Sequence, residues 1–286
     1  MNIGIVGLGL IGGSLGLDLR SQRHRVLGVS RQERTCQLAI ARGVVDDASV
    51  DLALLTAADV VFICTPLAAI SSTVHQLIPH LSPTAILTDV GSVKLSVVKT
   101  IAPLWPNFVG GHPMAGNSES GIESAQFRLF KNNPYVITPT NETPPTVTET
   151  VENLARSLGA IIYRCSPADH DRAVAWISHL PVIISASLIG ACLNEPDPAV
   201  LKLAQNFASS GFRDTSRVGG GNPELGVMMA RYNRIELLRS LEQYRDRFDQ
   251  IFDQIEREDW QGLAQQLLIN QQARPRFVDP KQELEF

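Results

Sequence analysis

The chain has 286 residues, of which 44% are apolar and 19% charged, and its formal net charge at pH 7 is -4. This length accommodates two domains with a substantial core, and the composition is that of an ordinary globular protein. No dense run of Lys and Arg is present to neutralise phosphates, which argues against nucleic acid as a partner.

The cysteines and the apolar stretches predict the compartment. The four cysteines are far apart and form no C-x-x-C pair or His-containing cluster at metal spacing, so we expect reduced thiols, a cytoplasmic protein and no metal site. No basic region precedes the first apolar residues, so we expect no signal peptide. The longest apolar-rich stretch, residues 182–193, is shorter than the ~20 residues of a membrane span, so no membrane partner is expected.

The first sixteen residues, M-N-I-G-I-V-G-L-G-L-I-G-G-S-L-G, predict a strand, a tight turn and a helix. In the G-x-G-x-x-G turn, Gly7 permits the sharp bend, Gly9 lets the backbone approach a pyrophosphate, and Gly12 lets helix and strand pack closely. A glycine-rich turn can also arise for backbone reasons alone. The strand before it and the helical spacing after it favour dinucleotide binding through Gly7, Leu8, Gly9, Leu10, Ile11 and Gly12.

The second predicted strand covers residues 25–29, and the position after it selects between the two nicotinamide cofactors. An acidic residue there accepts hydrogen bonds from a ribose 2′-OH, whereas a small hydroxyl beside an arginine suits a 2′-phosphate. Ser30 and Arg31 occupy this position and Arg34 follows, so we expect NADP. The alternative is that these arginines are merely solvated.

Further strands are predicted at residues 59–64, 85–90, 107–111, 135–138 and 160–164. Apolar strands that alternate with helices indicate an α/β fold with a doubly wound, mostly parallel sheet of the Rossmann type. Ligands of such sheets bind outside the carboxyl ends of the strands. Thr65 and Pro66, residues 91–94 and residues 111–114 follow three of these strands, so we expect them to line one crevice with the glycine turn.

We place the domain boundary between residues 165 and 166, which gives a dinucleotide-binding domain (1–165) and an all-helical second domain (166–286). Residues 138–145 are rich in turn formers, but a helix and a strand of the first domain still follow them. Ser166, Pro167 and Asp169 then mark a helix start, as N-cap, first helical residue and capping-box acid. Pro181 is expected to kink or interrupt that helix.

The segment 223–257 carries a wide apolar stripe at a spacing of three and four, which includes Leu237, Leu241, Tyr244, Phe248, Ile251 and Ile255. Such a stripe on a terminal helix is most often intramolecular core, and a helical dimer interface is its second interpretation. Residues 279–286 are polar and unpatterned, and no function is assigned to them.

His112 is the candidate catalytic base. It is predicted to follow a strand on the cofactor edge of the sheet, between two glycines and Pro113. An imidazole can take a hydroxyl proton near neutral pH while hydride leaves the same carbon. Ser92, at another strand end, is expected to hydrogen-bond the substrate or position His112, and an N-cap role for it is equally open.

Two histidines lie nine residues apart on the first helix of the second domain, on roughly opposite faces. We expect His179, close to Pro181, to face the crevice and His170 to belong to a solvated first turn. Farther along, Arg213 and Arg217 share a face if their segment is helical, and arginine suits two-point recognition of a carboxylate. The alternative for Arg213 is a surface pair with Asp214, which contributes little.

These motifs together resemble the prephenate/arogenate dehydrogenase family of tyrosine biosynthesis, most closely its microbial NADP-using arogenate dehydrogenases. The resemblance rests on the glycine turn and on D-V-G-S-V-K (residues 89–94), G-G-H-P-M-A-G (110–116), I-S-H-L-P (177–181) and G-F-R-D-T-S-R (211–217). It implies oxidation of a cyclohexadienyl acid by hydride transfer to NADP, with loss of carbon dioxide from the ring.

Carried across by motif, the resemblance makes His112 the base at the carbinol, supported by Ser92, and places His179 in the substrate cleft. It selects Arg217 as the ligand of a substrate carboxylate, and Asp214 is a candidate partner for the arogenate ammonium. It also implies a homodimer through the helical domain. Gly226 departs from family members that carry an aromatic residue near this place, so contacts there are not carried over.

Two other functions share part of this sequence pattern. A β-hydroxyacid dehydrogenase has a similar architecture but typically uses a catalytic lysine from its helical domain. Only Lys202 and Lys281 lie beyond residue 166, neither in a glycine-rich helical motif of that kind. A non-catalytic NADP sensor predicts cofactor binding without turnover, and prephenate in place of arogenate is the nearer alternative.

Overall fold

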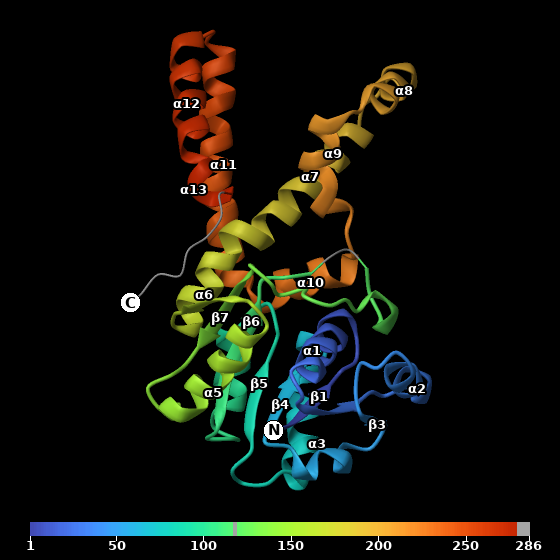
Figure 1. Ribbon diagram of the computed structural model, residues 1–286. Helices are drawn as coiled ribbons and strands as arrows, with labels where there is room; N and C mark the ends of the chain where they lie inside the picture. Colours follow the sequence, from blue (N-terminus) through green and yellow to red (C-terminus); the bar gives the residue numbers. More distant parts are fainter. Residues whose placement is uncertain (117–118, 279–286) are drawn as a thin grey trace. The chain divides into compact units, whose positions relative to one another are not determined.

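The structure is a computed structural model that describes residues 1–116 and 119–278. Its described residues form two compact units, one up to residue 171 and one from residue 172 to residue 278. Figure 1 labels most of their helices and strands. The predicted boundary between residues 165 and 166 stays a prediction about the functional domains, and residues 279–286 lie outside the described part of the chain.

The first unit is built on an eight-stranded sheet of order β3-β2-β1-β4-β5-β6-β7-β8. The first six strands in this order, from β3 at the edge to β6, pair in parallel with their neighbours. Strand β7 is antiparallel to β6, and β8 is parallel to β7. The strand bounds are β1 Asn2–Val6, β2 Arg25–Val29, β3 Asp47–Ser49, β4 Val60–Ile63, β5 Ile86–Asp89, β6 Phe108–Pro113, β7 Pro134–Thr138 and β8 Ile161–Arg164. The prediction of a mostly parallel, doubly wound sheet is confirmed.

Helices cover both faces of this sheet. The α-helices of the unit are α1 Leu10–Ser21, α2 Glu33–Ala41, α3 Leu67–Leu77, α4 Leu95–Ile101, α5 Pro145–Ser157 and the start of α6 Pro167–Val174. Leu15 of α1 and Val151 of α5 belong to one buried cluster, whereas α3 and α4 contact each other and bury residues outside it. The strand order reverses between β1 and β4, because the chain builds the sheet first from β1 toward β3 and then from β4 toward β8. Right-handed crossovers in these two directions place their helices on opposite faces of the sheet.

Two details of the sheet differ from the predictions. The three-residue strand β3 has no apolar run and depends on pairing with β2, so its sequence carries little strand signal. The antiparallel direction of β7 was not predicted either. It follows from the segment between β6 and β7, which contains only the short 3₁₀ turn η3 (Ile122–Ser124) among its described residues and no crossover α-helix there.

The second unit is helical in its described residues. Its elements are η4 Ala175–His179, α7 Leu180–Leu193, α8 Pro198–Phe207, α9 Ser210–Ser216, η5 Arg217–Gly220, α10 Pro223–Tyr232, α11 Arg234–Glu256, α12 Trp260–Ala273 and α13 Pro275–Val278. The helices α11 and α12 contact each other and lie side by side in Figure 1. The prediction of a helical second half is confirmed.

Pro181 does not end the helix, but the α-helical pattern is interrupted directly before it, in line with the expected kink or interruption. The helix runs from α6 through η4 into α7, and η4 is a π-helical segment directly before Leu180 and Pro181. A proline inside an α-helix clashes with the carbonyl four residues earlier and lacks an N–H to bond it. A wider π turn at this point relieves both problems without breaking the helix.

This continuous helix is longer than the apolar stretch on which the absence of a membrane span was predicted. Residues Pro167–Leu193 form 27 helical residues that by length and composition alone could cross a membrane, with 17% of the most apolar window buried. The expectation that the apolar stretch is too short for a span therefore holds for residues 182–193 but not for the helix that contains them. Core helices of soluble proteins can have the same length and composition, so this helix does not by itself indicate a membrane protein.

The first interpretation of the apolar stripe, intramolecular core, does not describe most of α11. Leu237 is buried, but Phe248, Phe252 and Ile255 are each at least half exposed in the single chain. On α12, Leu267, Leu268 and Ile269 are exposed to a similar degree. The helix pair α11 and α12 is too thin to bury both of its apolar faces by itself.

Candidate active site

The glycine turn has the backbone geometry that its sequence predicts. Gly7 has a φ of +101° and its N–H donates to the Val29 carbonyl over 2.8 Å. A Cβ at Gly7 would lie 2.6 Å from the Cys64 carbonyl oxygen, and one at Gly12 would lie 2.0 Å from the Gly7 carbonyl oxygen. Both positions therefore require glycine, the first for its positive φ and both for the close approach of backbone.

Gly9 is different, because a Cβ there would meet nothing within 4 Å. Gly9 is the N-cap of α1, and no side chain caps the helix or contributes an acid to its first turn. Nearby at the end of β4, the buried hydroxyl oxygen of Thr65 has no hydrogen-bond partner among the described residues. Free helix N–H groups, open space and an unpartnered hydroxyl fit the phosphates of a dinucleotide.

The residues expected to choose the cofactor follow β2 as predicted. β2 ends at Val29, so Ser30 is the first residue after the strand, and its hydroxyl accepts a hydrogen bond from the Gln32 N–H at 3.4 Å. Arg31 and Arg34 are exposed. Two exposed guanidinium groups beside a small hydroxyl are suited to a 2′-phosphate.

A buried ion pair joins the ends of β5 and β6. The Lys94 ammonium donates to the Asp89 carboxylate and, over 2.7 Å, to the Gly111 carbonyl, and both charged side chains are fully buried. Asp89 also accepts from the N–H groups of Gly91 at 2.8 Å and of Gly111 at 3.3 Å. Burial lowers the pKa of Lys94, an effect that the Asp89 charge opposes. The pair fixes the loop that carries Ser92 against the strand that carries His112.

The same loop is held by Asp171 on α6. One Asp171 oxygen accepts from the Lys94 N–H at 2.7 Å, and the other accepts from the Leu95 N–H at 2.9 Å. Asp171 thus satisfies the first N–H groups of α4 from a distant part of the chain. The N-cap role considered for Ser92 is wrong, because Lys94 occupies the N-cap position and Ser92 stands two residues earlier, half-buried.

His112 lies within β6, in register with Val136 of β7, and does not follow the strand as predicted. It is nevertheless at the carboxyl end, because β6 extends beyond its pairing with β5 and its last four residues pair only with β7. Its side chain is buried and its Nδ1 lies 2.8 Å from Nε2 of His170.

The prediction that His170 is solvated is wrong. The His170 side chain is 2% exposed and uses both ring nitrogens, one toward His112 and one toward Asp171 Oδ1 at 2.7 Å. The predicted N-cap before it is confirmed, since the Asp169 N–H donates to the Ser166 hydroxyl. The capped first turn is exposed at Ser166 and Asp169, but His170 projects from it into the protein.

The sequence placed Lys94 among the residues that line the crevice but did not predict its ion pair with Asp89, and it did not identify Asp89 or Asp171 as site residues. A lysine inside the apolar run V-K-L-S-V-V, five residues after an acid that ends a strand, is a signal that could have identified the pair. No comparable local signal points from Asp171 to α4, because the two are 76 residues apart.

His179 and Arg217 both belong to the second unit. His179 is buried, and its Nδ1 lies 3.1 Å from the side-chain amide nitrogen of Asn233. The turn η5, which begins at Arg217, packs closely on α7, where a Cβ at Gly219 would lie 2.3 Å from the Ala186 nitrogen. This close approach fixes the position of Arg217 relative to the helix that follows His179.

Arg213 lies in α9, which ends at Ser216, and Arg217 begins the 3₁₀ turn η5, so the two arginines belong to consecutive elements and not to one α-helix. Arg213 lies 3.7 Å from Asp214, and both side chains are about three-quarters exposed. This is the surface pair that was the alternative for Arg213. Such a pair contributes little to stability.

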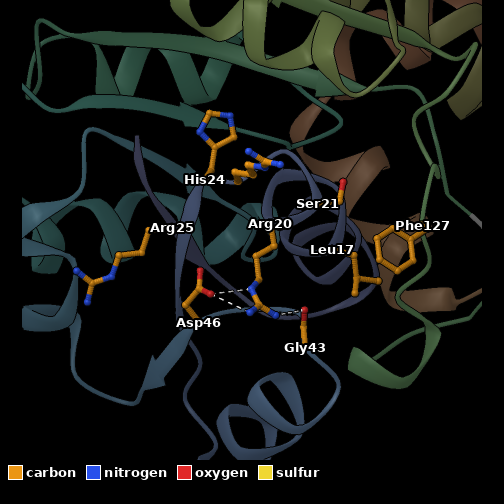
Figure 2. Close-up of a pocket in the computed structure, with 9 residues that line it drawn as sticks. Leu17, Arg20, Ser21, His24, Arg25, Gly43, Asp46 and Phe127 are labelled. Atoms are coloured by element: carbon orange, nitrogen blue, oxygen red, sulfur yellow. Dashed lines mark hydrogen bonds and ion pairs between the residues drawn. The ribbon is translucent and has the colours of Figure 1, made fainter.

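A cavity of about 540 Å³ lies elsewhere on the first unit, between the end of α1 and the start of β2 (Figure 2). There Arg20 donates to the Asp46 carboxylate at 2.9 Å and to the Gly43 carbonyl at 2.6 Å, as the dashed lines show. Because Arg25 at its edge begins β2, the cavity is at the amino ends of the strands. It is therefore on the opposite edge from the glycine turn and separate from the candidate site.

Comparisons with known proteins agree with this geometry. The family model described as "Prephenate dehydrogenase, nucleotide-binding domain" matches residues 15–164, and "Prephenate dehydrogenase, dimerization domain" matches residues 166–268. The chain belongs to the prephenate dehydrogenase family. It is therefore an oxidoreductase with a nucleotide-binding domain, and the resemblance found in the sequence is confirmed.

Three relatives illustrate the similarity. The prephenate dehydrogenase of Bacillus subtilis is 32% identical over 91% of this chain and 71% of its own length. The crystal structure of Synechocystis arogenate dehydrogenase matches with a TM-score of 0.88 and 54% identity over 97% of this chain and all of that one. The Aquifex aeolicus prephenate dehydrogenase in complex with hydroxyphenyl propionate and NAD+ matches with a TM-score of 0.91 and 26% identity, over 96% and 98% of the two chains.

Proposed function

We propose that this dehydrogenase converts arogenate to tyrosine by oxidative decarboxylation, with NADP as the hydride acceptor. The observation that carries the substrate assignment is the 54% identity to the Synechocystis arogenate dehydrogenase over nearly the whole of both chains. Prephenate, named for the Bacillus subtilis and Aquifex aeolicus relatives, is the alternative substrate.

The glycine turn holds the dinucleotide, which also lies beside Thr65 and Pro66. The residues of the turn are Gly7, Leu8, Gly9, Leu10, Ile11 and Gly12. The open space at Gly9 and the uncapped start of α1 support this placement. Ser30, Arg31 and Arg34 bind the 2′-phosphate, which the order Ser-Arg directly after β2 supports. When bound, the oxidised nicotinamide supplies the acceptor for a hydride.

His112 is the general base of the reaction. It takes the carbinol hydroxyl proton while the C–H bond of the same carbon breaks with both electrons, and the carbinol becomes a carbonyl. The bond from the ring to its carboxylate then breaks, its electron pair enters the ring, and carbon dioxide leaves. His112 returns its proton to the ring oxygen, which becomes the phenol of tyrosine. Ser92, on the loop fixed by Lys94 and Asp171, hydrogen-bonds the substrate or His112.

The second unit supplies the groups that bind the substrate. Arg217 binds a carboxylate, His179 lies in the substrate cleft, and Asp214 is the candidate for the ammonium group, with Arg213 beside it. The buried position of His179 and the fixed position of η5 on α7 support a preformed arrangement. An ammonium partner distinguishes arogenate from prephenate, because prephenate carries a keto group there.

The functional unit is a cytoplasmic homodimer with no membrane or nucleic-acid partner, divided into the domains 1–165 and 166–286. The exposed apolar residues of α11 and α12 support a dimer through the helical domain, since a second copy would remove them from water. Four free cysteines support a reducing compartment.

Initial rates of nicotinamide reduction test this proposal, with arogenate or prephenate each paired with NADP or NAD. We expect turnover to be greatest with arogenate and NADP. A preference for prephenate would keep the reaction and overturn the substrate. Cofactor binding without turnover in any combination would overturn the activity in favour of the sensor alternative.

A further inference from the structure

A chain of three buried side chains leads from His112 into the first unit. His112 Nδ1 lies 2.8 Å from His170 Nε2, and His170 Nδ1 lies 2.7 Å from Asp171 Oδ1. The exposed fractions are 8% for His112, 2% for His170 and 3% for Asp171. The two imidazoles meet edge to face, at an interplanar angle of 67°. Water therefore has little access to these contacts, and the direction of each hydrogen bond is set by the protein.

The direction is determined from the Asp171 end. An ionised carboxylate only accepts hydrogen bonds, and that of Asp171 already accepts from the N–H groups of Lys94 and Leu95. His170 Nδ1, bonded to the same carboxylate, must then carry a hydrogen and donate it. Two backbone donors that cannot change their role thus fix the orientation of His170.

The protonation of His170 determines which ring nitrogen of His112 carries the hydrogen. Burial lowers the pKa of His170, and the Lys94 charge acts in the same direction, whereas Asp171 and Asp89 oppose it. A neutral His170 protonated on Nδ1 has a lone pair on Nε2, which accepts a hydrogen bond from Nδ1–H of His112. His112 then has its own lone pair on Nε2.

We propose that His170 and Asp171 are positioning residues that hold His112 in the tautomer protonated on Nδ1, so that Nε2 of His112 is the atom that takes the carbinol proton. The use of that proton rests on the proposed function, whereas the tautomer itself does not. An aspartate that orients a catalytic histidine through Nδ1–H is an arrangement known from hydrolases, where the wrong tautomer abolishes most of the rate. Here a second histidine stands between the acid and the base.

Asp171 also connects the two parts of the candidate site. The carboxylate that orients His170 is the one that holds the backbone at Lys94 and Leu95, two and three residues beyond Ser92. One side chain therefore positions both the base on β6 and the hydroxyl on the loop after β5. A change at Asp171 should disturb both, whereas a change at His170 should disturb only the base.

The test compares two amide replacements of His170. In His170→Gln the side-chain oxygen can reach the place of Nε2 and accept Nδ1–H from His112. In His170→Asn the shorter amide can reach the place of Nδ1 and keep the bond to Asp171, but it leaves His112 without this acceptor. If His170 only supports Asp171, His170→Asn should retain more activity than His170→Gln. If His170 positions His112, His170→Gln should retain more.

The direct measurement is the pair of imidazole ¹⁵N shifts of His112 in the protein without substrate or cofactor, assigned by loss of the signals in His112→Gln. We expect the Nδ1–H tautomer in the wild type and in His170→Gln, and its loss in His170→Asn. We expect kcat to fall about 10²-fold in His170→Asn and much less in His170→Gln, because a general base contributes about 10²–10⁴-fold. His75→Gln, at an exposed histidine on α3, is the matched control and should leave both readouts unchanged.

Three results would overturn the inference: an Nε2–H tautomer of His112 in the wild type, unchanged shifts in His170→Asn, or full kcat in that variant. If His170→Asn does not fold, Asp171→Ala replaces it, because it leaves no side-chain oxygen to accept Nδ1–H of His170, and an unchanged His112 tautomer there refutes the orienting role. Absence of turnover in the wild type, with the expected ¹⁵N shifts present, would refute the proposed function but leave the tautomer assignment standing.

Discussion

Replacing Lys94 by Met should strongly destabilise the first unit. The substitution keeps most of the apolar stem but removes the ammonium group, so the fully buried Asp89 carboxylate loses its counter-ion. Asp89 keeps the N–H groups of Gly91 and Gly111 as donors, whereas the Gly111 carbonyl loses the ammonium at 2.7 Å. Breaking a buried pair from one side costs about 3–5 kcal/mol of unfolding free energy.

This prediction can be measured by urea unfolding monitored through Trp105, which is buried in the first unit and donates to the Ala85 carbonyl. Trp176 and Trp260 are replaced by Phe so that the fluorescence reports only that unit. With a urea slope of about 2–3 kcal/mol per molar, a loss of about 4 kcal/mol lowers the midpoint by about 1–2 M. Lys99→Met, at an exposed lysine of the same helix, is the matched control.

A double-mutant cycle completes the test, with Lys94→Met, Asp89→Asn and the double variant that carries both substitutions. Removing both charges should recover part of the loss, because neither partner is left buried and ionised. The reasoning is refuted if Lys94→Met loses less than about 1 kcal/mol, or if the double variant loses as much as the sum of its two single variants.

Four further predictions concern activity and pH. His112→Ala should lower turnover by about 10²–10⁴-fold with cofactor affinity nearly unchanged, and normal turnover would remove His112 from the mechanism. Arg217→Ala should weaken substrate binding by about 2–5 kcal/mol, and an unchanged KM would make Arg217 structural. Ser30→Asp combined with Arg31→Ala should shift preference toward NAD, and retained NADP selectivity would mean that the 2′-phosphate is bound elsewhere. Because burial lowers the pKa of His170 below its ordinary 6.5, the unfolded chain takes up this proton first as the pH falls. The stability contributed by neutral His170 should be complete above pH 6.5 and decrease below it, by up to about 1.4 kcal/mol per pH unit, and urea unfolding of His170→Gln should show a flatter pH dependence.

The sequence alone determined the features that depend on neighbouring residues. The glycine turn follows from steric needs of the backbone at Gly7 and Gly12, so its pattern is visible in six residues. The N-cap at Ser166 and the strand that ends at Val29 are equally local. The motifs around His112 are specific enough to indicate the family by their residues and spacing alone.

Only the tertiary structure decided which groups surround His112. His170 follows a capped, exposed turn, and an exposed environment was the reasonable expectation from that context. Its burial depends on β6, 58 residues away in the chain, and the partner of Asp171 is the start of α4, 76 residues away. Neither local spacing nor composition records such contacts, because they arise when the parallel strands bring their carboxyl ends to one edge of the sheet. The tautomer of His112, and with it the atom available for catalysis, is set by those distant contacts.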